Sequence, residues 1–405
     1  MLRFARNDGG TELTPAARVQ AAIELLDGIV DAARSGGAAA DTLIARYFKD
    51  RRYAGSKDRR AVRELVYRAI RRAGDVPPSG RAAMAGLARE DEALAPLFDG
   101  SAHGPARLDP DEPAAPATIV PDWIRERLDP IVAPEELPAL LDRAPLDLRV
   151  NRLRGTPQDA LAALPEAARS PLSPIGLRLP EGYRVEDSDA WSSGLIEVQD
   201  EGSQLLSLAC AASPGENVID LCAGAGGKTL ALAAEMANRG QLIASDTDRG
   251  RLSRMAPRLN RAGVTIVEPR LLNPGGEPEA LRDLVGQADL VLVDAPCSGS
   301  GTWRRNPETR WRLTPGRLEQ LVALQARLLD TAAPLLKPGG RLVYAVCSLL
   351  AEEGRGQAQA FTTRSSLLPQ PVSMNAGRAA GIGRLLSPAA DGTDGFFIAC
   401  WSRPC

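Results

Sequence analysis

The chain has 405 residues, of which 44% are hydrophobic and 25% are charged, and its formal net charge is -2. This composition excludes a mainly disordered or collagen-like chain, and the length predicts two or three folded domains. No run of 18 apolar residues occurs and residues 1–15 contain no apolar signal core, so we expect a cytoplasmic protein without a membrane span. The six cysteines include no CxxC pair, which argues against a disulfide framework and against a metal site.

Residues 1–100 are predicted to form a helical domain. Apolar residues recur at helical spacing after Thr14 and again after Ser56. Between Arg46 and Arg72 eleven basic residues stand against three acidic ones, a local excess of eight positive charges. Such a run usually marks a solvated helix face, but arginine also grips phosphates. We therefore predict RNA contacts by the exposed face of the second helix, at Arg59, Arg60 and Arg63.

The composition changes after this domain. Residues 101–117 are rich in Pro, Gly and Ala and are predicted to be a linker. Residues 118–200 alternate short apolar runs with turns, which predicts a small α+β module. We expect this module to bind RNA. We expect a strand within 146–154, a helix within 156–166 and a pair of strands within 176–185.

From residue 201 to residue 405 the pattern becomes regular, because apolar strands alternate with helices. The predicted strands lie at 217–221, 241–246, 264–268, 288–294, 339–346 and 395–401. This alternation predicts an α/β fold of the Rossmann-like type, a doubly wound and mostly parallel sheet. Ligands of such sheets bind at the carboxyl ends of the strands.

A glycine-rich turn, DLCAGAGGKT at residues 220–229, joins the first of these strands to its helix. Its spacing is too short for a phosphate-binding P-loop, and it keeps only the first two glycines of the NAD-binding GxGxxG pattern. S-adenosylmethionine fits better, since Asp220 precedes the turn and Asp246 ends the second strand, where it can accept both ribose hydroxyls. The acid alone leaves NAD open, and a tight turn without a ligand also stays open.

Two cysteines follow neighbouring strands, Cys297 in the loop DAPCSGSG and Cys347 after the strand that ends near 346. His103 is the only histidine, so a mechanism built on a histidine base would have to use that residue. Methylation of carbon 5 of a pyrimidine fits two thiols, because one adds to carbon 6 and the other assists release. Asp294 can bond the ring nitrogen and exocyclic amine, which favours cytosine. The remaining cysteines inside strands and helices are expected to be small core residues.

Further motifs occur in a fixed order, namely Arg304–Pro307 (RRNP), Trp311–Leu313, Cys347–Ser348 with Glu352–Glu353, and Asp394–Phe397 (DGFF). In combination with the glycine turn and the DAPCSGSG loop, they resemble the Nol/Nop/Sun family of RNA cytosine-5 methyltransferases, in its bacterial RsmB-like branch. The resemblance covers roughly residues 120–405, and the N-terminal helices resemble the NusB-like RNA-binding domain of RsmB proteins more weakly. It implies S-adenosylmethionine as cofactor and RNA, most of all 16S rRNA, as substrate.

The resemblance also implies a role for each matching residue. Cys347 matches the nucleophile, Cys297 the cysteine that assists product release, and Asp294 an acid shared by cofactor and base. Asp246 matches the ribose-binding acid, and the cofactor loop matches Cys222, Ala223, Gly224, Ala225, Gly226, Gly227 and Lys228. One segment departs from the family, because a Gly-Asp near the end of the third strand, on the adenine side, is replaced by Glu268-Pro269.

Residues 303–312 (WRRNPETRWR) interleave tryptophan with arginine, which fits either a surface loop or a groove for single-stranded RNA. Arg304 and Arg305 are the RNA contacts predicted there, and their charge is expected to favour a thiolate nearby. Three alternatives stay open for the function. They are methylation of tRNA, methylation of an amine, and an RNA-binding ribosome-assembly factor that has lost its activity.

Overall fold

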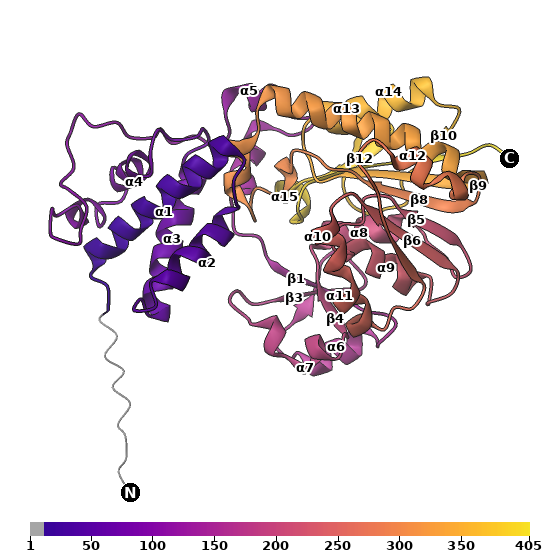
Figure 1. Cartoon of the computed structure of the whole chain (residues 1–405), viewed down its shortest axis with the longest axis horizontal. Coiled ribbons are helices and arrows are strands. Elements are labelled where there is room, and N and C mark those ends of the chain that lie inside the picture. The colour runs from indigo at the N-terminus through magenta and orange to yellow at the C-terminus, as the bar shows by residue number, and fades with distance from the viewer. Residues whose placement is uncertain (1–11) are drawn as a thin grey trace, which may run out of the picture. The chain divides into compact units, whose positions relative to one another are not determined.

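The computed structural model describes residues 12–405 (Figure 1). Most of the N-terminal stretch from which the absence of a signal core was predicted lies outside the described residues. The chain divides into two compact units, one of residues up to Glu126 together with Asn306–Leu313, and one of Arg127–Arg305 with Thr314–Cys405. Among the described helices, none combines the length and the apolar character needed to cross a bilayer.

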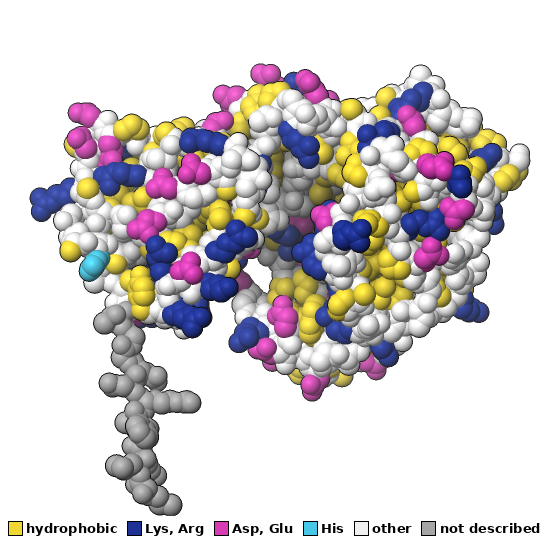
Figure 2. All heavy atoms as spheres, viewed as in Figure 1, with side chains coloured by type: hydrophobic (Ala, Val, Ile, Leu, Met, Phe, Trp, Pro, Cys, Tyr) yellow, Lys and Arg dark blue, Asp and Glu magenta, His cyan; other side chains and the backbone are white. Residues whose placement is uncertain are grey.

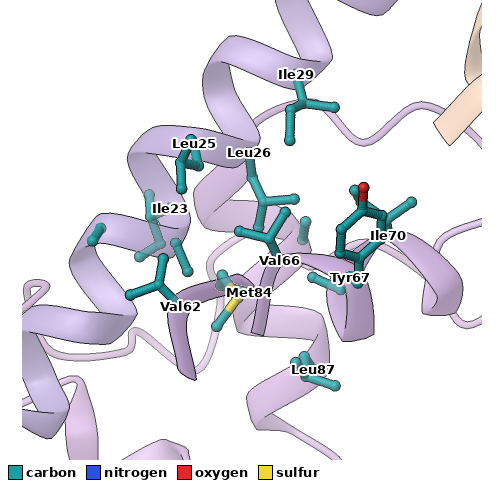
Figure 3. Packing of buried hydrophobic residues seen from close by; sticks show 14 of the residues in the cluster. Ile23, Leu25, Leu26, Ile29, Val62, Val66, Tyr67, Ile70, Met84 and Leu87 are labelled. Carbon is teal, nitrogen blue, oxygen red and sulfur yellow. The ribbon is translucent and has the colours of Figure 1, made fainter. Parts of the chain in front are cut away.

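The first unit is helical, as predicted. Its helices are α1 (Pro15–Ser35), α2 (Ala40–Asp50), α3 (Ser56–Arg72), α4 (Gly80–Ala88) and α5 (Asp122–Arg125). The side chain of Thr14 caps α1 by accepting a hydrogen bond from the backbone N–H of Ala17. Figure 3 shows how the apolar faces of α1, α3 and α4 meet in one core. The core residues it labels are Ile23, Leu25, Leu26, Ile29, Val62, Val66, Tyr67, Ile70, Met84 and Leu87.

Residues 101–117, predicted to be a linker, instead pack as part of the helical unit. The Arg81 guanidinium donates to the backbone carbonyls of Ala106 and Arg107 and pairs with the Glu112 carboxylate. The backbone N–H of Ala115 donates to the carbonyl of Ala82 in α4, and Ala115 is buried. The difference has a physical cause, because side chains of α4 satisfy a backbone that has no regular structure of its own.

Residues 306–313 also belong to the helical unit and form a 3-10 helix, η6 (Pro307–Arg312). Arg310 is 1% exposed, and its Nη2 donates to the carbonyls of Ile70, Arg71 and Ala73 at the end of α3. The indole N–H of Trp311 donates to the same Ala73 carbonyl over 2.7 Å. These groups cap α3, so they do not line an open groove for RNA.

The second unit begins at Arg127 and contains an α+β module, whereas residues 118–126 of the module predicted for 118–200 belong to the helical unit. Its four strands form a sheet in the order β2-β3-β1-β4, in which every neighbouring pair is antiparallel. The elements are β1 (Leu146–Val150), α6 (Pro157–Ala163), β2 (Ala168–Arg169), β3 (Gly176–Leu179), α7 (Asp189–Ser192) and β4 (Ile196–Val198). The second strand of the pair predicted within 176–185 is absent, since residues 185–187 form a short 3-10 turn and β3 pairs with β1 and β2 instead.

A nine-stranded sheet forms the rest of the second unit. Its main order is β11-β12-β13-β9-β8-β5-β6-β7, and β10 pairs with β13. The five strands from β9 to β7 run parallel, whereas β13 is antiparallel to β9. These strands are β5 (Asn217–Asp220), β6 (Gln241–Asp246), β7 (Val267–Leu271), β8 (Ala288–Asp294), β9 (Leu336–Val346), β10 (Leu368–Gln370), β11 (Arg378–Ala380), β12 (Gly383–Leu386) and β13 (Phe396–Ser402).

Helices between these strands complete the doubly wound layers (Figure 1). They are α8 (Glu201–Ala209), α9 (Gly227–Glu235), α10 (Arg249–Ser253), α11 (Met255–Ala262), α12 (Glu277–Ala280), α13 (Pro315–Ala332), α14 (Gln357–Arg364) and α15 (Pro388–Asp391). The strand order reverses between β5 and β8, so a crevice for ligands is expected at the carboxyl ends of these strands. The predicted Rossmann-like fold is confirmed. The third strand begins three residues later than predicted, at Val267.

Candidate active site

The glycine turn after β5 is shaped for close contact with a ligand. Gly224 and Gly226 have φ values of 57° and 85°, a left-handed conformation that favours glycine. A side chain at Gly226 would collide with Met255, while one at Gly224 would meet nothing closer than Arg251 at 4.0 Å. Gly224 thus leaves space on its open side, and that space belongs to a cavity.

The cavity has a volume of about 590 Å³, which lies in the range typical of small-molecule sites. Asp246 lines it, and each of its carboxylate oxygens accepts one backbone N–H, from Gly224 at 2.8 Å and from Asp248 at 2.7 Å. Each oxygen keeps a lone pair for a ribose hydroxyl. The open glycine turn and this acid together fit the predicted S-adenosylmethionine, and Cys222, Ala223 and Ala225 line the same cavity.

Asp220 supports the turn from inside the protein and does not line the cavity. It is fully buried, and its Oδ2 accepts a hydrogen bond of 2.7 Å from the Thr229 hydroxyl. Its Oδ1 has no hydrogen-bond partner among the described residues. Burial raises the pKa of Asp220 to about 7, although the bond from Thr229 acts in the opposite direction.

The two predicted cysteines meet at the cavity wall. Cys297 follows β8 and Cys347 follows β9, and their Sγ atoms lie 3.3 Å apart. Both side chains line the cavity and are partly exposed. The hydrogen bond to Cys347 and burial raise the pKa of the Cys297 thiol well above its ordinary value. This shift favours the thiol form of Cys297, and either sulfur atom can be the donor in their contact.

A buried carboxylate fixes the two cysteine loops to each other. Glu353 is fully buried, and its oxygens accept from the Ser298 backbone N–H, from the Ser298 and Ser348 hydroxyls, and from the Gln325 amide. Ser298 and Ser348 each follow one of the cysteines directly. The sequence showed an acid at this position, but only the fold reveals that one side chain joins both loops.

Lys228 and Asp294 form an ion pair beside the cysteines, with 2.6 Å between Nζ and Oδ2. Burial lowers the pKa of Lys228, but the attraction of Asp294 and of Cys347 outweighs it and raises this pKa overall. Lys228 was predicted to belong to the cofactor loop. In the structure its ammonium pairs with Asp294, which lines the cavity.

Arg304 and Arg305 do not supply that positive charge, which corrects the sequence-based expectation. Arg304 is 5% exposed, and both guanidinium groups pair with the carboxylates of Asp200 and Asp394. Two positive and two negative charges thus cancel within one cluster. Trp303 is buried as well. Arg304 is therefore enclosed by the protein, whereas Arg305 is 30% exposed at its side chain and its predicted RNA contact stays a prediction.

The arginines of α3 have a different environment. Arg59, Arg60 and Arg63 are exposed, and Arg63 pairs with Asp41 over 2.8 Å. Further along α3, Arg68 pairs with Asp91 and Arg72 with Glu90. Figure 2 shows Lys and Arg side chains of the helical unit interspersed with Asp and Glu, and the single histidine on the surface of that unit. The excess of eight charges counted in the sequence is therefore reduced by partners from other segments.

Cys210 and Cys400 are buried in the apolar core of the second unit, as expected. Sequence reasoning missed another group, Glu277, which begins α12 and lines the cavity together with Arg327. Glu277 lies in a stretch rich in Gly and Pro, NPGGEPE, where nothing in the spacing of residues distinguishes it from a surface acid.

Comparison with known proteins places this site in a family. Residues 207–402 match the family model described as "16S rRNA methyltransferase RsmB/F". The ribosomal RNA small subunit methyltransferase B of Salmonella arizonae is 36% identical over 286 residues, which are 69% of this chain and 65% of that protein. The chain thus spans 65% of the length of this curated relative.

Two crystal structures extend the comparison to the fold. The protein PH0851 superposes with a TM-score of 0.75 at 25% identity, over 96% of this chain and 99% of its own. A methyltransferase homolog protein from Pyrococcus horikoshii superposes with a TM-score of 0.61 at 30% identity, over 69% of this chain and 94% of its own. The similarity to PH0851 therefore includes the helical unit as well as the sheet.

Proposed function

We propose that this chain, which belongs to the RsmB/F methyltransferase family, methylates carbon 5 of cytosine in RNA. Its motifs predicted this family, and its cofactor is S-adenosylmethionine. The observation that carries the proposal is the contact of 3.3 Å between the sulfur atoms of Cys297 and Cys347 at the cofactor cavity. Two thiols at one ligand site suit covalent chemistry on a pyrimidine ring. The proposed substrate is 16S rRNA, which the family description names.

Cys347 acts as the nucleophile in this proposal. Its thiolate adds to carbon 6, the new C–S bond breaks the aromatic conjugation, and the electron pair makes carbon 5 nucleophilic. Lys228 lies beside this site in its ion pair with Asp294, and the sulfur of Cys297 is within hydrogen-bond distance of the attacking sulfur. When bound, S-adenosylmethionine would offer carbon 5 an electrophilic methyl group, and S-adenosylhomocysteine would be the leaving group. Asp294 lines the cavity where it can accept from the exocyclic amine of cytosine.

Cys297 acts in the second stage. The proton on carbon 5 must leave to a base, and the electrons of that C–H bond then restore the ring double bond and expel Cys347 as a thiolate. Cys297 is assigned to this stage because its sulfur touches the leaving sulfur. The target base must also leave its stack to reach the cavity, which favours a flexible or single-stranded site in the RNA.

Methyl transfer to 16S rRNA tests the proposal directly. Purified protein is incubated with radiolabelled S-adenosylmethionine and with 16S rRNA or bulk tRNA, and the digested nucleosides are identified by mass spectrometry. We expect 5-methylcytidine from 16S rRNA, a loss of at least about 1000-fold in Cys347→Ala, and normal transfer in Cys405→Ala, which changes an exposed cysteine.

Each other product identifies a different function. Radiolabel found only in tRNA would show that tRNA is the substrate. Formation of N4-methylcytidine would indicate methylation of an amine. RNA binding without any transfer would indicate an assembly factor. Full activity in Cys347→Ala would contradict the covalent chemistry.

A further inference from the structure

Glu277 is a buried carboxylate whose hydrogen bonding is incomplete. The residue is 2% exposed, and its Oε1 accepts a hydrogen bond from Arg327 Nη2 over 3.3 Å. Its Oε2 is buried and has no hydrogen-bond partner among the described residues. A buried acceptor without a donor destabilises the folded protein. Since Glu277 lines the cofactor cavity, a bound ligand is the natural source of the missing donor.

The lining of the cavity shows which part of the ligand Glu277 can reach. Cys297 and Cys347 follow β8 and β9, and Asp246 ends β6, at the shared carboxyl edge of the parallel strands. Glu277 lies in the connection that runs from β7 back to β8, where Arg327 of α13 contacts it. A methyl donor whose reactive sulfur faces the cysteines and whose ribose meets Asp246 has its base free to contact the wall that this connection and α13 supply.

The walls of this end suit a flat aromatic base. Leu272 and Pro274 line it from the segment after β7, and Leu324 and Leu328 line it from α13. Glu268, the acid in the third strand itself, is half exposed and pairs with Arg270, and neither residue lines the cavity. Glu277 is thus the acid that this segment turns toward the cofactor.

We propose that Glu277 recognises the adenine base, with Oε2 accepting a hydrogen bond from the exocyclic amine. Adenine offers an N–H donor there, whereas hypoxanthine carries a carbonyl oxygen at the same position. Two acceptors would then face each other in a buried site, so the carboxylate rejects hypoxanthine as well as binding adenine. Arg327 holds the other oxygen and fixes the direction of the carboxylate. This inference depends on S-adenosylmethionine being the cofactor, and it does not depend on which RNA base is methylated.

Binding of two matched ligands tests this role without any RNA. Isothermal titration calorimetry is done with S-adenosylhomocysteine and with S-inosylhomocysteine, which replaces the amine by oxygen. The wild-type protein should bind the adenine ligand at least about 100-fold more tightly. In Glu277→Gln this ratio should fall below about tenfold, because the amide can donate to the oxygen or accept from the amine.

The matched control is Glu279→Gln, two residues further along α12, where the carboxylate is 76% exposed and pairs with Arg282. It should keep the wild-type ratio. Asp246→Asn should weaken both ligands to the same degree, because the ribose is common to them. If Glu277→Gln does not fold, Glu277→Asp withdraws the oxygens by one methylene and should also lower the ratio.

A wild-type ratio near one, or a ratio unchanged in a folded Glu277 variant, would overturn the proposal. Because RNA takes no part, such a result would leave the methylation of cytosine untouched. If the wild-type protein transfers no methyl group to RNA but still prefers S-adenosylhomocysteine over S-inosylhomocysteine as predicted, only the proposed function is contradicted.

Discussion

Two arginine-rich stretches resemble each other as sequences and differ in how deeply the fold buries some of their arginines. In α3 the arginines Arg59, Arg60 and Arg63 are exposed on a helix surface. In residues 304–312, Arg304 and Arg310 are buried and bind carboxylates or backbone carbonyls. The chemistry of the side chain is the same, so the number of acceptors that the fold gathers around it decides between structure and binding.

The largest effect that this comparison predicts is on stability. Arg304→Ala leaves Asp200 and Asp394 with one arginine fewer inside the protein, and we expect the free energy of unfolding to fall by about 3–5 kcal/mol. Arg60→Ala, the exposed control, should change it by less than about 0.5 kcal/mol. Urea denaturation measures both. Equal free energies of unfolding for the two variants would show that the buried arginine contributes no more to stability than the exposed one.

The buried carboxyl group of Asp220 offers a second test of how burial changes the behaviour of a charged side chain, through the dependence of stability on pH. The pKa of Asp220 is about 7 in the folded protein, above its ordinary value of 3.8, so the folded state holds a proton that the unfolded state has lost between these values. The unfolding free energy should therefore fall as the pH rises from about 4 to 7, by up to about 1.4 kcal/mol per unit. Asp220→Asn lacks this contribution and should gain stability relative to wild type over that range. A constant difference across the range would contradict the raised pKa.

The smallest effect on stability is expected at the exposed arginines of α3. Changing Arg59, Arg60 and Arg63 together to Gln should alter the unfolding free energy by at most about 1 kcal/mol. Their predicted role is in RNA binding, so the slope of log affinity against log salt should become shallower by roughly 2 to 3. Filter binding at several salt concentrations measures the slope. An unchanged slope would make this face an ordinary solvated helix surface.

The sequence predicted the order of strands and helices well, because their apolar periodicity is local. It failed where distant side chains decide the structure. Residues 101–117 have the composition of a linker, yet Arg81 holds their carbonyls against α4. The WRRNPETRWR segment has the composition of an RNA groove, yet Arg310 and Trp311 cap α3. No local pattern reveals such long-range partners.

In the candidate active site, too, local motifs were predicted from the sequence and long-range contacts were not. The glycine turn, Asp246 and the two cysteines lie in recognisable motifs at strand ends, and the sheet brings them to one cavity. Glu277 and the bonds of Glu353 to both cysteine loops depend on tertiary contacts. Lys228 was found by its motif, but its ion pair with Asp294 required the fold. Motifs thus identify the reacting groups, whereas the groups that orient them come from packing.

In the proposed mechanism Cys347 attacks the base and Cys297 assists its release. The most direct measurement is a denaturing gel of Cys297→Ala after incubation with S-adenosylmethionine and 16S rRNA. We predict a slowly migrating protein–RNA band that is absent when Cys347 is also changed to Ala. Absence of the band in Cys297→Ala, or its persistence in the double variant, would contradict the assignment of the two sulfur atoms.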